Sequence, residues 1–463
     1  MADKRAGGDT TAPQSSVVAL VAARIQLLHV VHVPDGVAGQ GGPRVPVEST
    51  EVVIGREPQG PRTLALADAR VSRNHAAVRR DAAGDMLLTD CGSTHGTFVD
   101  GVRVEQAPLV HGSVVRVGDT LIVVSDTRLT VEQAKTLAPE TPALLGPSLA
   151  MQRVRGEIAL VAPRPLSVLV LGETGVGKER VAEELHRTSG RTGPLLALNC
   201  AAVAPSLAES ELFGHAAGAF TGAVQKNDGV FVAADRGTLF LDEVAELPAA
   251  LQPKLLRALA TGEVRAVGRS EGRKVDVRVV AATHGDLEGA VHAGTFRGDL
   301  YARLAGWVLL VPPLRERRED VVRLAGAFIA RQAPATKLSA NAAEALLLHP
   351  WPFNVRELEQ SVNAALVRAT EGILRYEHLP APVARPIAAR SKDASTDPPP
   401  APLRVRVPGD SVPDAEGLRS VLDELGGNVA RVAAYFGKDR KQIYRWAERL
   451  GVKIDAGRPG SSD

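Results

Sequence analysis

The spacing of hydrophobic and polar positions changes along the chain, and each change predicts a different kind of structure. Over residues 17–125, short alternating or β-branched runs are separated by turn residues every 8–12 positions, which predicts a β-sandwich. From 146 to 312, strand-length apolar runs alternate with helical stretches, as in LSVLVLG followed by KERVAEELHR. This alternation predicts a parallel sheet with helices on both faces.

Composition and helical spacing divide the rest of the chain. Residues 313–380 read as all-helical, and residues 413–456 read as a small helical unit. We therefore expect a multidomain protein with a β-sandwich, an α/β domain with a helical lid, and a small all-α unit. The remaining segments are expected to be a disordered N-terminus at 1–16, a linker with some helical tendency at 126–145, a Pro-rich linker at 381–412 and a polar tail at 457–463.

Length, charge and cysteine content limit the class of protein. A chain of 463 residues is too long for one ordinary core. The net charge is +2, from 55 basic and 53 acidic residues, so nucleic-acid contact has to come from a local basic patch. Two distant cysteines exclude a disulfide framework and suggest no metal site. Apolar runs are shorter than the roughly 20 residues that span a bilayer, so we expect a soluble cytoplasmic protein with no membrane partner.

The segment GETGVGKE has the pattern of a phosphate-binding loop. It lies between an apolar strand-like run and a helical stretch, which is the context that such a loop requires. Glycines let backbone amides face phosphate oxygens, and the start of a helix adds positive potential. A chance glycine turn is the alternative. The expected nucleotide-binding residues are Gly172, Glu173, Thr174, Gly175, Val176, Gly177, Lys178 and Glu179.

A second pattern, GTLFLDE, is an apolar strand that ends in two carboxylates, Asp242 and Glu243. Glu179 stands where phosphate-loop proteins usually have a Ser or Thr that binds magnesium. We therefore expect Asp242 to contact Mg²⁺, directly or through water, and Glu243 to polarise the attacking water. A pair of exposed acids without this role is the alternative.

Between these two patterns lies the hexapeptide GAFTGA, formed by Gly218, Ala219, Phe220, Thr221, Gly222 and Ala223. Two glycines flank one large apolar ring, which predicts a flexible loop that carries an interface anchor. The alternative is a buried turn with Phe220 in the core.

These motifs resemble those of one protein family. Residues 146–380 resemble the AAA+ domain of bacterial enhancer-binding proteins, the sigma-54-dependent transcription activators. The resemblance implies ATP and Mg²⁺ as cofactors, a hexameric ring when active, and contact of residues 218–223 with sigma-54 in the RNA polymerase holoenzyme. The matching segments include GETGVGKE, LALNCAAV, ESELFGHAAGAFTGA, GTLFLDE, VRVVAATHGDL, FRGDLYARL, PPLRERRED and WPFNVRELE.

The resemblance also implies roles for polar residues. Asn199 would be the switch that holds Glu243 until the γ-phosphate is sensed. Arg297 and Arg303 would be fingers that reach the nucleotide of the next subunit, and Arg356 would be the sensor arginine of the lid. A trans arginine offsets transition-state charge and makes hydrolysis depend on ring assembly.

Two positions depart from the family pattern. His284, expected to contact the nucleotide, stands where the family usually has Asn at the end of a sensor strand. Phe353 stands where the family usually has Gly, and it would be strained if that position has a positive φ.

The N-terminal β-rich region contains IGRE, DARVSRNHAAV and CGSTHGTFVDG, which are glycine-rich turns that carry donors for an anion. This region resembles a forkhead-associated (FHA) domain, which reads phosphothreonine peptides. The resemblance implies that Gly55 and His75 fix the loop geometry. A sandwich used only for protein contact is the alternative. The phosphopeptide-binding residues implied by the resemblance are Arg56, Ser72, Arg73 and Thr94, with His95 where the family often has Asn.

Residues 415–450 have the helix spacing of a helix-turn-helix, with breaks at GGN and FGK. A local excess of basic residues on the last helix favours DNA contact, and the unit resembles the Fis-like domain of the same activators. A solvated helical hairpin is the alternative. The expected DNA-binding residues are Arg440, Lys441, Gln442 and Arg445.

Together these resemblances imply an ATP-driven activator that binds enhancer DNA, reads a phosphothreonine-containing protein and remodels sigma-54 polymerase. Two other hypotheses remain: an AAA+ remodeller of another protein substrate, and a phosphopeptide-binding DNA scaffold with weak ATPase activity.

Overall fold

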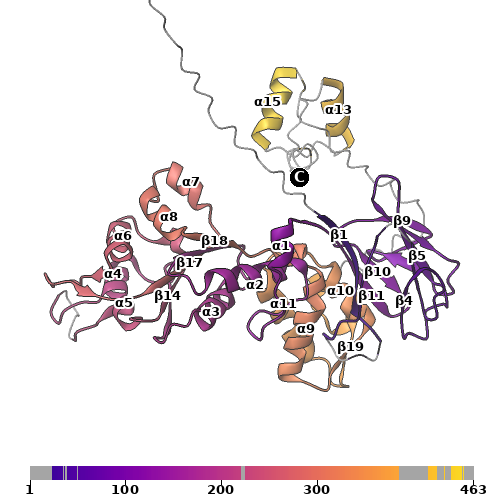
Figure 1. The fold of residues 1–463 in the computed structure, drawn as a ribbon, viewed down its shortest axis with the longest axis horizontal. Helices are drawn as coiled ribbons and strands as arrows, with labels where there is room; N and C mark the ends of the chain where they lie inside the picture. Colours follow the sequence, from indigo (N-terminus) through magenta and orange to yellow (C-terminus); the bar gives the residue numbers. More distant parts are fainter. Residues whose placement is uncertain are drawn as a thin grey trace, which may run out of the picture. The chain divides into compact units, whose positions relative to one another are not determined.

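A computed structural model describes residues 23–34, 36, 39–48, 51–219, 225–384, 415–424, 432, 440–450 and 452. These residues belong to two compact units, one within 1–393 and the other within 394–463 (Figure 1). The larger unit contains a β-sandwich, an α/β domain and a helical lid, as the sequence pattern predicts. The smaller unit contains the C-terminal helices.

The β-sandwich consists of a six-stranded and a five-stranded sheet that enclose one apolar core. Leu28, Ile54, Val78 and Ile122 lie in this core because alternate residues of each strand face the opposite sheet. The six-stranded sheet is β2 (Arg44–Pro46), β1 (Ala23–His32), β11 (Thr120–Leu129), β10 (Val114–Val117), β7 (Thr97–Val99) and β8 (Val102–Val104). The five-stranded sheet is β4 (Arg62–Ala65), β3 (Val52–Gly55), β5 (Ala76–Arg80), β6 (Met86–Asp90) and β9 (Gln106–Leu109).

Strand β11 continues to Leu129, four residues beyond position 125, where the turn pattern placed the end of the sandwich. The extension is held by antiparallel pairing with β1, in which Ala23 lies opposite Leu129. The linker therefore starts at the short helix α1 (Val131–Lys135), which Thr130 caps.

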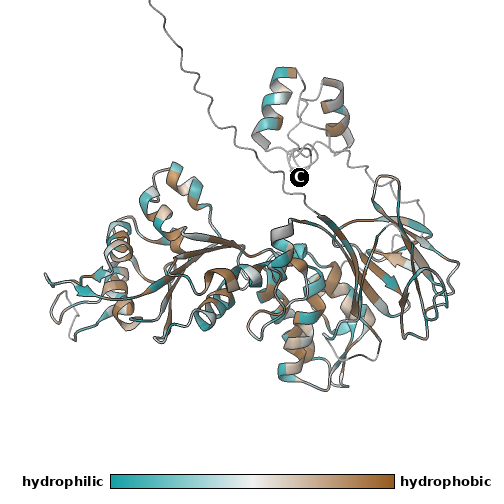
Figure 2. Ribbon diagram, viewed as in Figure 1, coloured by the Kyte–Doolittle hydropathy of each residue, from teal (hydrophilic) through white to brown (hydrophobic). Residues whose placement is uncertain are grey.

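The α/β domain is built on a five-stranded parallel sheet. One face packs on α2 (Leu149–Val161) and α3 (Lys178–Thr188), and the other packs on α4 (Pro205–Phe213), α5 (Gly229–Ala233), α6 (Gln252–Thr261), α7 (Leu287–His292) and α8 (Gly298–Leu304). The strands of this domain are coloured as hydrophobic, and so are parts of the helices that pack on them (Figure 2). The strand order is β13 (Leu195–Asn199), β14 (Thr238–Asp242), β17 (Arg278–Thr283), β12 (Val168–Leu171) and β18 (Trp307–Leu310).

The lid consists of α9 (Glu319–Gln332), α10 (Ala340–Leu348) and α11 (Asn354–Leu366), with the short parallel pair β19 (Lys337–Leu338) and β20 (Ile373–Leu374). Its core is centred on Trp351, a fully buried residue whose indole N–H donates to the carbonyl of Leu346 at 2.9 Å. This bond satisfies the only polar atom of the indole, so burying the large ring leaves no hydrogen-bond donor without a partner.

A buried polar contact joins the lid to the α/β domain. Asp320, which is 0% exposed, accepts hydrogen bonds from the backbone N and the hydroxyl of Ser148, the N-cap of α2, at 2.7 and 2.8 Å. Arg317, which is 2% exposed, approaches Asp320 at 3.8 Å and donates to the carbonyl of Val176 at 3.0 Å. This contact therefore fixes the lid against the segment that precedes α3.

In the smaller unit, α13 (Ala415–Glu424) and α15 (Arg440–Leu450) pack around an apolar core. The core contains Leu418, Leu422, Val432, Ile443 and Trp446. Ala433 and the turns at GGN and FGK lie outside the described residues. Among all described residues, no helix is both long enough and apolar enough to cross a bilayer.

Replacing Asp320 with Ala is expected to destabilise the larger unit by about 3–5 kcal/mol, because Arg317 would stay buried without its charge partner. Chemical denaturation monitored by circular dichroism would measure this change. The matched control is Glu371→Ala, which removes a 67%-exposed carboxylate paired with Arg375 and should cost about 1 kcal/mol or less. Equal effects of the two substitutions would contradict the assigned role of Asp320.

Candidate functional site

The phosphate-binding loop connects β12 to α3, as the sequence predicts. Gly175 and Gly177 have φ values of +79° and +104°, a region of backbone conformation that favours glycine. A Cβ at Gly175 would lie 2.3 Å from the carbonyl oxygen of Phe353, so a side chain would also clash with the lid. The turn leads directly into the N-terminus of α3, whose free amides and positive potential suit an anion.

Lys178 lies at the start of α3 with its side chain largely buried. Its ammonium group donates to the carbonyl oxygens of Gly172 and Glu173 at 3.0 and 3.5 Å. It also lies 3.5 Å from Oε1 of Glu243. One ammonium group therefore bridges the phosphate loop and the carboxylate at the end of β14.

Glu243 is held at both carboxylate oxygens. Its Oε2 accepts from Nδ1 of His284 at 2.7 Å, from the His284 amide at 3.2 Å and from the hydroxyl of Thr283 at 3.3 Å. Burial alone would raise the pKa of the Glu243 carboxyl, but the His284 donors and Lys178 outweigh it and lower that pKa. The backbone at Glu243 has a φ of +50°, which is uncommon outside glycine and frequent at functional sites.

Asn199 contacts the neighbouring carboxylate of Asp242. Its side-chain amide donates to Oδ2 of Asp242 at 3.3 Å, and its side-chain oxygen accepts from the backbone N of Ala201 and Ala202. The expected contact with Glu243 therefore stays a prediction. The contact with Asp242 follows from register, because Asn199 on β13 lies opposite Asp242 on β14, one residue before Glu243. Burial, followed by the adjacent charge of Glu243, raises the pKa of the Asp242 carboxyl.

The donor set around Asp242 fits a magnesium ion held together with phosphate groups. Magnesium prefers oxygen ligands, and proteins often supply only one or two carboxylates beside the phosphates of the substrate. No group of three or more His, Cys, Asp or Glu side chains with metal-site geometry occurs among the described residues. A metal at Asp242 would therefore need nucleotide oxygens and water to complete its coordination.

The lid closes one side of the loop through residues that sequence reasoning missed. The side chain of Asn354 donates to the Glu173 carboxylate and to the carbonyl of Thr174, both at 3.1 Å. Arg315 forms a two-bond ion pair with Glu173, at 2.6 and 2.8 Å. Both residues lie inside the segments PPLRERRED and WPFNVRELE, but nothing in their spacing indicates this contact.

Phe353 does not have the backbone strain that a positive φ would cause, because its φ is −108°. The left-handed conformation falls instead on Asn354, at +55°. Phe353 as a whole residue is 61% exposed. Arg356 lies in the first turn of α11, where its backbone N donates to the carbonyl of Gly175 at 3.3 Å.

The two expected finger arginines have partners away from the phosphate loop. Arg297 precedes α8 and pairs with the exposed carboxylate of Asp299 at 2.8 Å. Arg303 donates to the carbonyl of Leu259 at 3.0 Å. The structure of a single chain therefore does not bring them to Lys178.

Of the GAFTGA hexapeptide, Gly218 and Ala219 are described, whereas Phe220, Thr221, Gly222 and Ala223 lie outside the described residues. The base of the loop is closed by two backbone hydrogen bonds between His215 and Asn227, at 2.8 and 3.1 Å.

The expected phosphopeptide residues come together at one end of the sandwich. The backbone N of Thr94 donates to the hydroxyl of Ser72 at 3.2 Å. A Cβ at Gly55 would lie 1.8 Å from the carbonyl oxygen of Arg73, so the turn needs glycine there. Buried His75 accepts from the Ser72 amide at 3.1 Å and contacts the carbonyl of Gly96 at 3.2 Å, which holds two loops together.

The cations beside these loops are exposed. Arg56 and Arg73 extend into solvent, and no partner for either guanidinium occurs among the described residues. His95 contacts the carbonyl of Arg70 through Nδ1 at 2.9 Å. Two unpaired guanidinium groups beside exposed hydroxyls form an arrangement that suits a phosphate.

On α15, Arg445 is exposed and Gln442 is half-buried. The side chains of Arg440 and Lys441 lie outside the described residues, although their backbone is helical.

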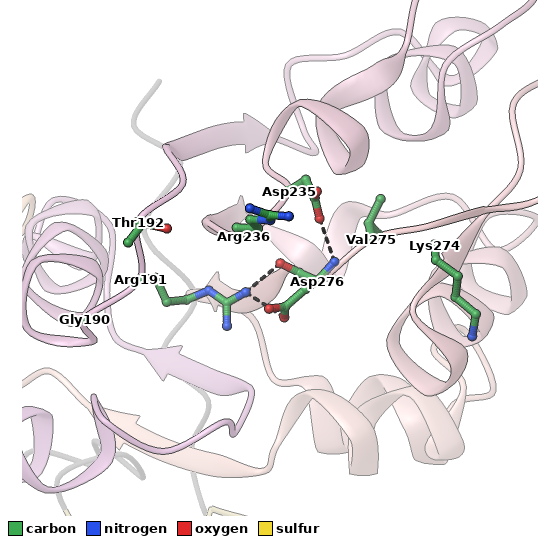
Figure 3. Close-up of a pocket in the computed structure, with 8 residues that line it drawn as sticks. All are labelled: Gly190, Arg191, Thr192, Asp235, Arg236, Lys274, Val275 and Asp276. Atoms are coloured by element: carbon green, nitrogen blue, oxygen red, sulfur yellow. Dashed lines mark hydrogen bonds and ion pairs between the residues drawn. The ribbon is translucent and has the colours of Figure 1, made fainter.

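A cavity of about 570 Å³ lies at the opposite edge of the parallel sheet (Figure 3). Its lining residues precede β13, β14 and β17, whereas Asn199, Asp242 and His284 lie at or just after the ends of these strands. An Arg191–Asp276 ion pair of 2.7 Å crosses it. Ligands of open parallel sheets bind at the carboxyl edge, so the candidate site is the phosphate loop and not this cavity.

Comparison with known proteins identifies three parts of the chain. Residues 144–309 match the Sigma-54 interaction domain, residues 52–118 match the FHA domain, and residues 315–396 match the AAA+ ATPase lid domain. The FHA and AAA+ identifications are thereby confirmed, whereas the helix-turn-helix stays a prediction.

Curated relatives include the anaerobic nitric oxide reductase transcription regulator NorR of Aeromonas hydrophila, which is 43% identical over 68% of this chain and 64% of that protein. The regulator NorR2 of Cupriavidus necator is 43% identical over 67% of this chain and 63% of that protein. The chain therefore spans somewhat less than two thirds of these relatives. A crystal structure of Brucella abortus NtrX with ATP is 32% identical over 70% of this chain and 72% of that one, with a TM-score of 0.48.

Proposed function

We propose that this chain, whose residues 144–309 match the Sigma-54 interaction domain, hydrolyses ATP to remodel sigma-54 RNA polymerase from upstream DNA. The observation that carries this proposal is the convergence of Lys178, Asp242 and Glu243 at the carboxyl edge of the parallel sheet. This arrangement combines a phosphate-binding cation, an oxygen ligand for a metal and a carboxylate that can orient water.

In the proposed reaction, the amides at the start of α3 and the ammonium of Lys178 bind the phosphates. Magnesium beside Asp242 would neutralise part of the phosphate charge. When Lys178 turns to the phosphates, it leaves Oε1 of Glu243 free to accept a proton from water. Oε2 stays fixed by His284 and Thr283, so His284 would act as a positioning residue for Glu243.

Arg297 and Arg303 would act in trans, across a hexameric ring. Their contacts in the single chain are with Asp299 and with a backbone carbonyl. An exposed ion pair and one carbonyl contact are weak enough to exchange for a phosphate of the next subunit. Hydrolysis would then drive residues 218–223 against sigma-54.

The test is ATP turnover by the full chain, with and without sigma-54 polymerase, combined with open-complex formation on a sigma-54 promoter. Turnover with open-complex formation supports the proposal. Turnover without engagement of sigma-54 favours a remodeller of another substrate. Absence of turnover, with DNA and phosphopeptide binding retained, favours a scaffold.

Two substitutions separate binding from chemistry. Lys178→Ala should weaken ATP binding by about 100-fold or more, because Lys178 is the one basic residue within GETGVGKE and would no longer pair with phosphate. Glu243→Gln should leave the Kd for ATP within about threefold and lower kcat by about 100- to 10,000-fold. Fluorescence titration and a phosphate-release assay measure the two effects. Full ATP affinity in Lys178→Ala would refute the phosphate-loop assignment.

For the FHA domain, we propose phosphothreonine recognition by Arg56, Ser72, Arg73, Thr94 and His95. Arg56→Ala should weaken binding of an oriented phosphothreonine peptide library by about 10- to 100-fold, because a charge-assisted hydrogen bond is lost. Binding arrays with phosphorylated and unphosphorylated peptides would measure it. The control is Arg79→Ala, an exposed arginine on β5, which should leave peptide binding unchanged. Unchanged binding by Arg56→Ala would indicate a domain used only for protein contact.

For the C-terminal unit, we propose DNA contact through Arg440, Lys441, Gln442 and Arg445. Arg445→Ala should weaken binding to promoter-upstream DNA and, if the contact is to phosphate, reduce the slope of log K against log salt by about 1. Fluorescence anisotropy at several salt concentrations would measure the slope. Arg419→Ala on α13 is the control, and equal effects of both substitutions would remove the assignment of α15 to the groove.

A further inference from the structure

The FHA sheet has a second apolar face, on the side away from its own core. Val31, Val114, Leu121 and Val123 are 3%, 1%, 0% and 0% exposed, and none of them belongs to the sandwich core. They alternate with sandwich residues, since Ile122 and Val124 face inward between and beside them. The outer face of an antiparallel sandwich is ordinarily polar and exposed to solvent, so an apolar outer face requires another element to cover it.

The covering element is the lid of the same chain. The four side chains share one hydrophobic cluster with residues of α9 and α10, including Val322, Ala325, Ile329, Ala342 and Leu346. The backbones also approach closely, because a Cβ at Gly39 would lie 2.8 Å from the Cα of Gly326. Dense packing of this kind is typical of a domain interior and unlike a transient contact between domains.

Polar contacts surround this shared core. Arg116 of β10 donates to Glu344 and Asn341 of α10, at 2.7 and 2.8 Å. Arg318 donates to the carbonyl of Gly112 at 2.9 Å, and Ser125 donates to Glu319. Glu344 and Glu319 are 4% and 2% exposed, so both carboxylates find their partners within a contact that excludes water.

We propose that the FHA domain is a permanent part of the lid and not a detachable input module. The face formed by Val31, Val114, Leu121 and Val123 is a docking surface whose occupant is α9 and α10 of the same chain. The lid, with the FHA sheet packed on it, contacts the phosphate loop directly. Arg317 donates to the carbonyl of Val176, and Asn354 donates to the carbonyl of Thr174. A signal received by the FHA loops therefore acts on the nucleotide site without release of the domain.

This inference goes beyond the proposed function, because it concerns the stability of the lid and does not require ATP turnover. The test is amide hydrogen exchange of the full-length chain carrying Val123→Asp. This substitution places a charge in the shared core, while the neighbouring side chains of the sandwich core are unchanged. The matched control is Val102→Asp, in the same sheet at a position that is 41% exposed.

In Val123→Asp, amides of α9 and α10 should exchange at least about tenfold faster than in the unmodified chain, whereas β3 and β5 keep their protection. Affinity for a fluorescent ATP analogue should fall, because the lid that contacts the phosphate loop is loosened. Val102→Asp should change neither. If Val123→Asp does not fold, Leu121→Ala provides a milder opening of the same core and should show the same pattern.

Two results would overturn the inference. Unchanged exchange of α9 and α10 in both Val123→Asp and Leu121→Ala would mean that the lid is stable without the FHA sheet. Increased ATP turnover with unchanged lid protection would identify the FHA domain as a removable inhibitor. If the chain has no ATP turnover, the exchange result still decides the inference.

Discussion

The parallel order of the five strands is the constraint on which the rest of the α/β domain depends. Strands that run in one direction end at one edge, and their register decides which polar residues meet there. Asn199 therefore lies beside Asp242, and Glu243 is the next residue past the strand. Lys178 reaches the same carboxylate from the phosphate loop, and His284 reaches it from the third strand. The apolar strands contribute stability, and their ends contribute the chemistry.

The phosphate loop is completed by the lid, and the lid is completed by the FHA sheet. Asn354 and Arg317 hold backbone carbonyls on either side of Gly175, so the loop conformation depends on where the lid lies. The lid in turn buries part of its core against Val123 and its neighbours. The sequence pattern separates the FHA domain, the α/β domain and the lid, but packing is continuous across both boundaries. The three parts therefore form one compact unit.

Short-range patterns account for the predictions that succeeded. Gly175 and Gly177 adopt the conformations that the glycine motif requires, and the apolar run before Asp242 is a buried strand. The alternation of strand and helix correctly predicted the α/β domain, because each element is specified by its own periodicity. Contacts between residues far apart in sequence were harder to predict from the sequence. The switch role of Asn199 was assigned by resemblance and stays a prediction, whereas the contact of its amide with Asp242 follows from the register of β13 and β14.

The sequence by itself determined the elements, the loop that receives phosphate and the families of the FHA and AAA+ parts, since each rests on residues close together in the chain. Only the tertiary structure decided that His284 and Lys178 share Glu243, that Asn354 closes on the phosphate loop, and that Val123 is a lid contact. Alternation along β11 marks which residues share a face, but it does not say what covers that face. That depends on packing between elements nearly two hundred residues apart, as in the Ser125–Glu319 contact.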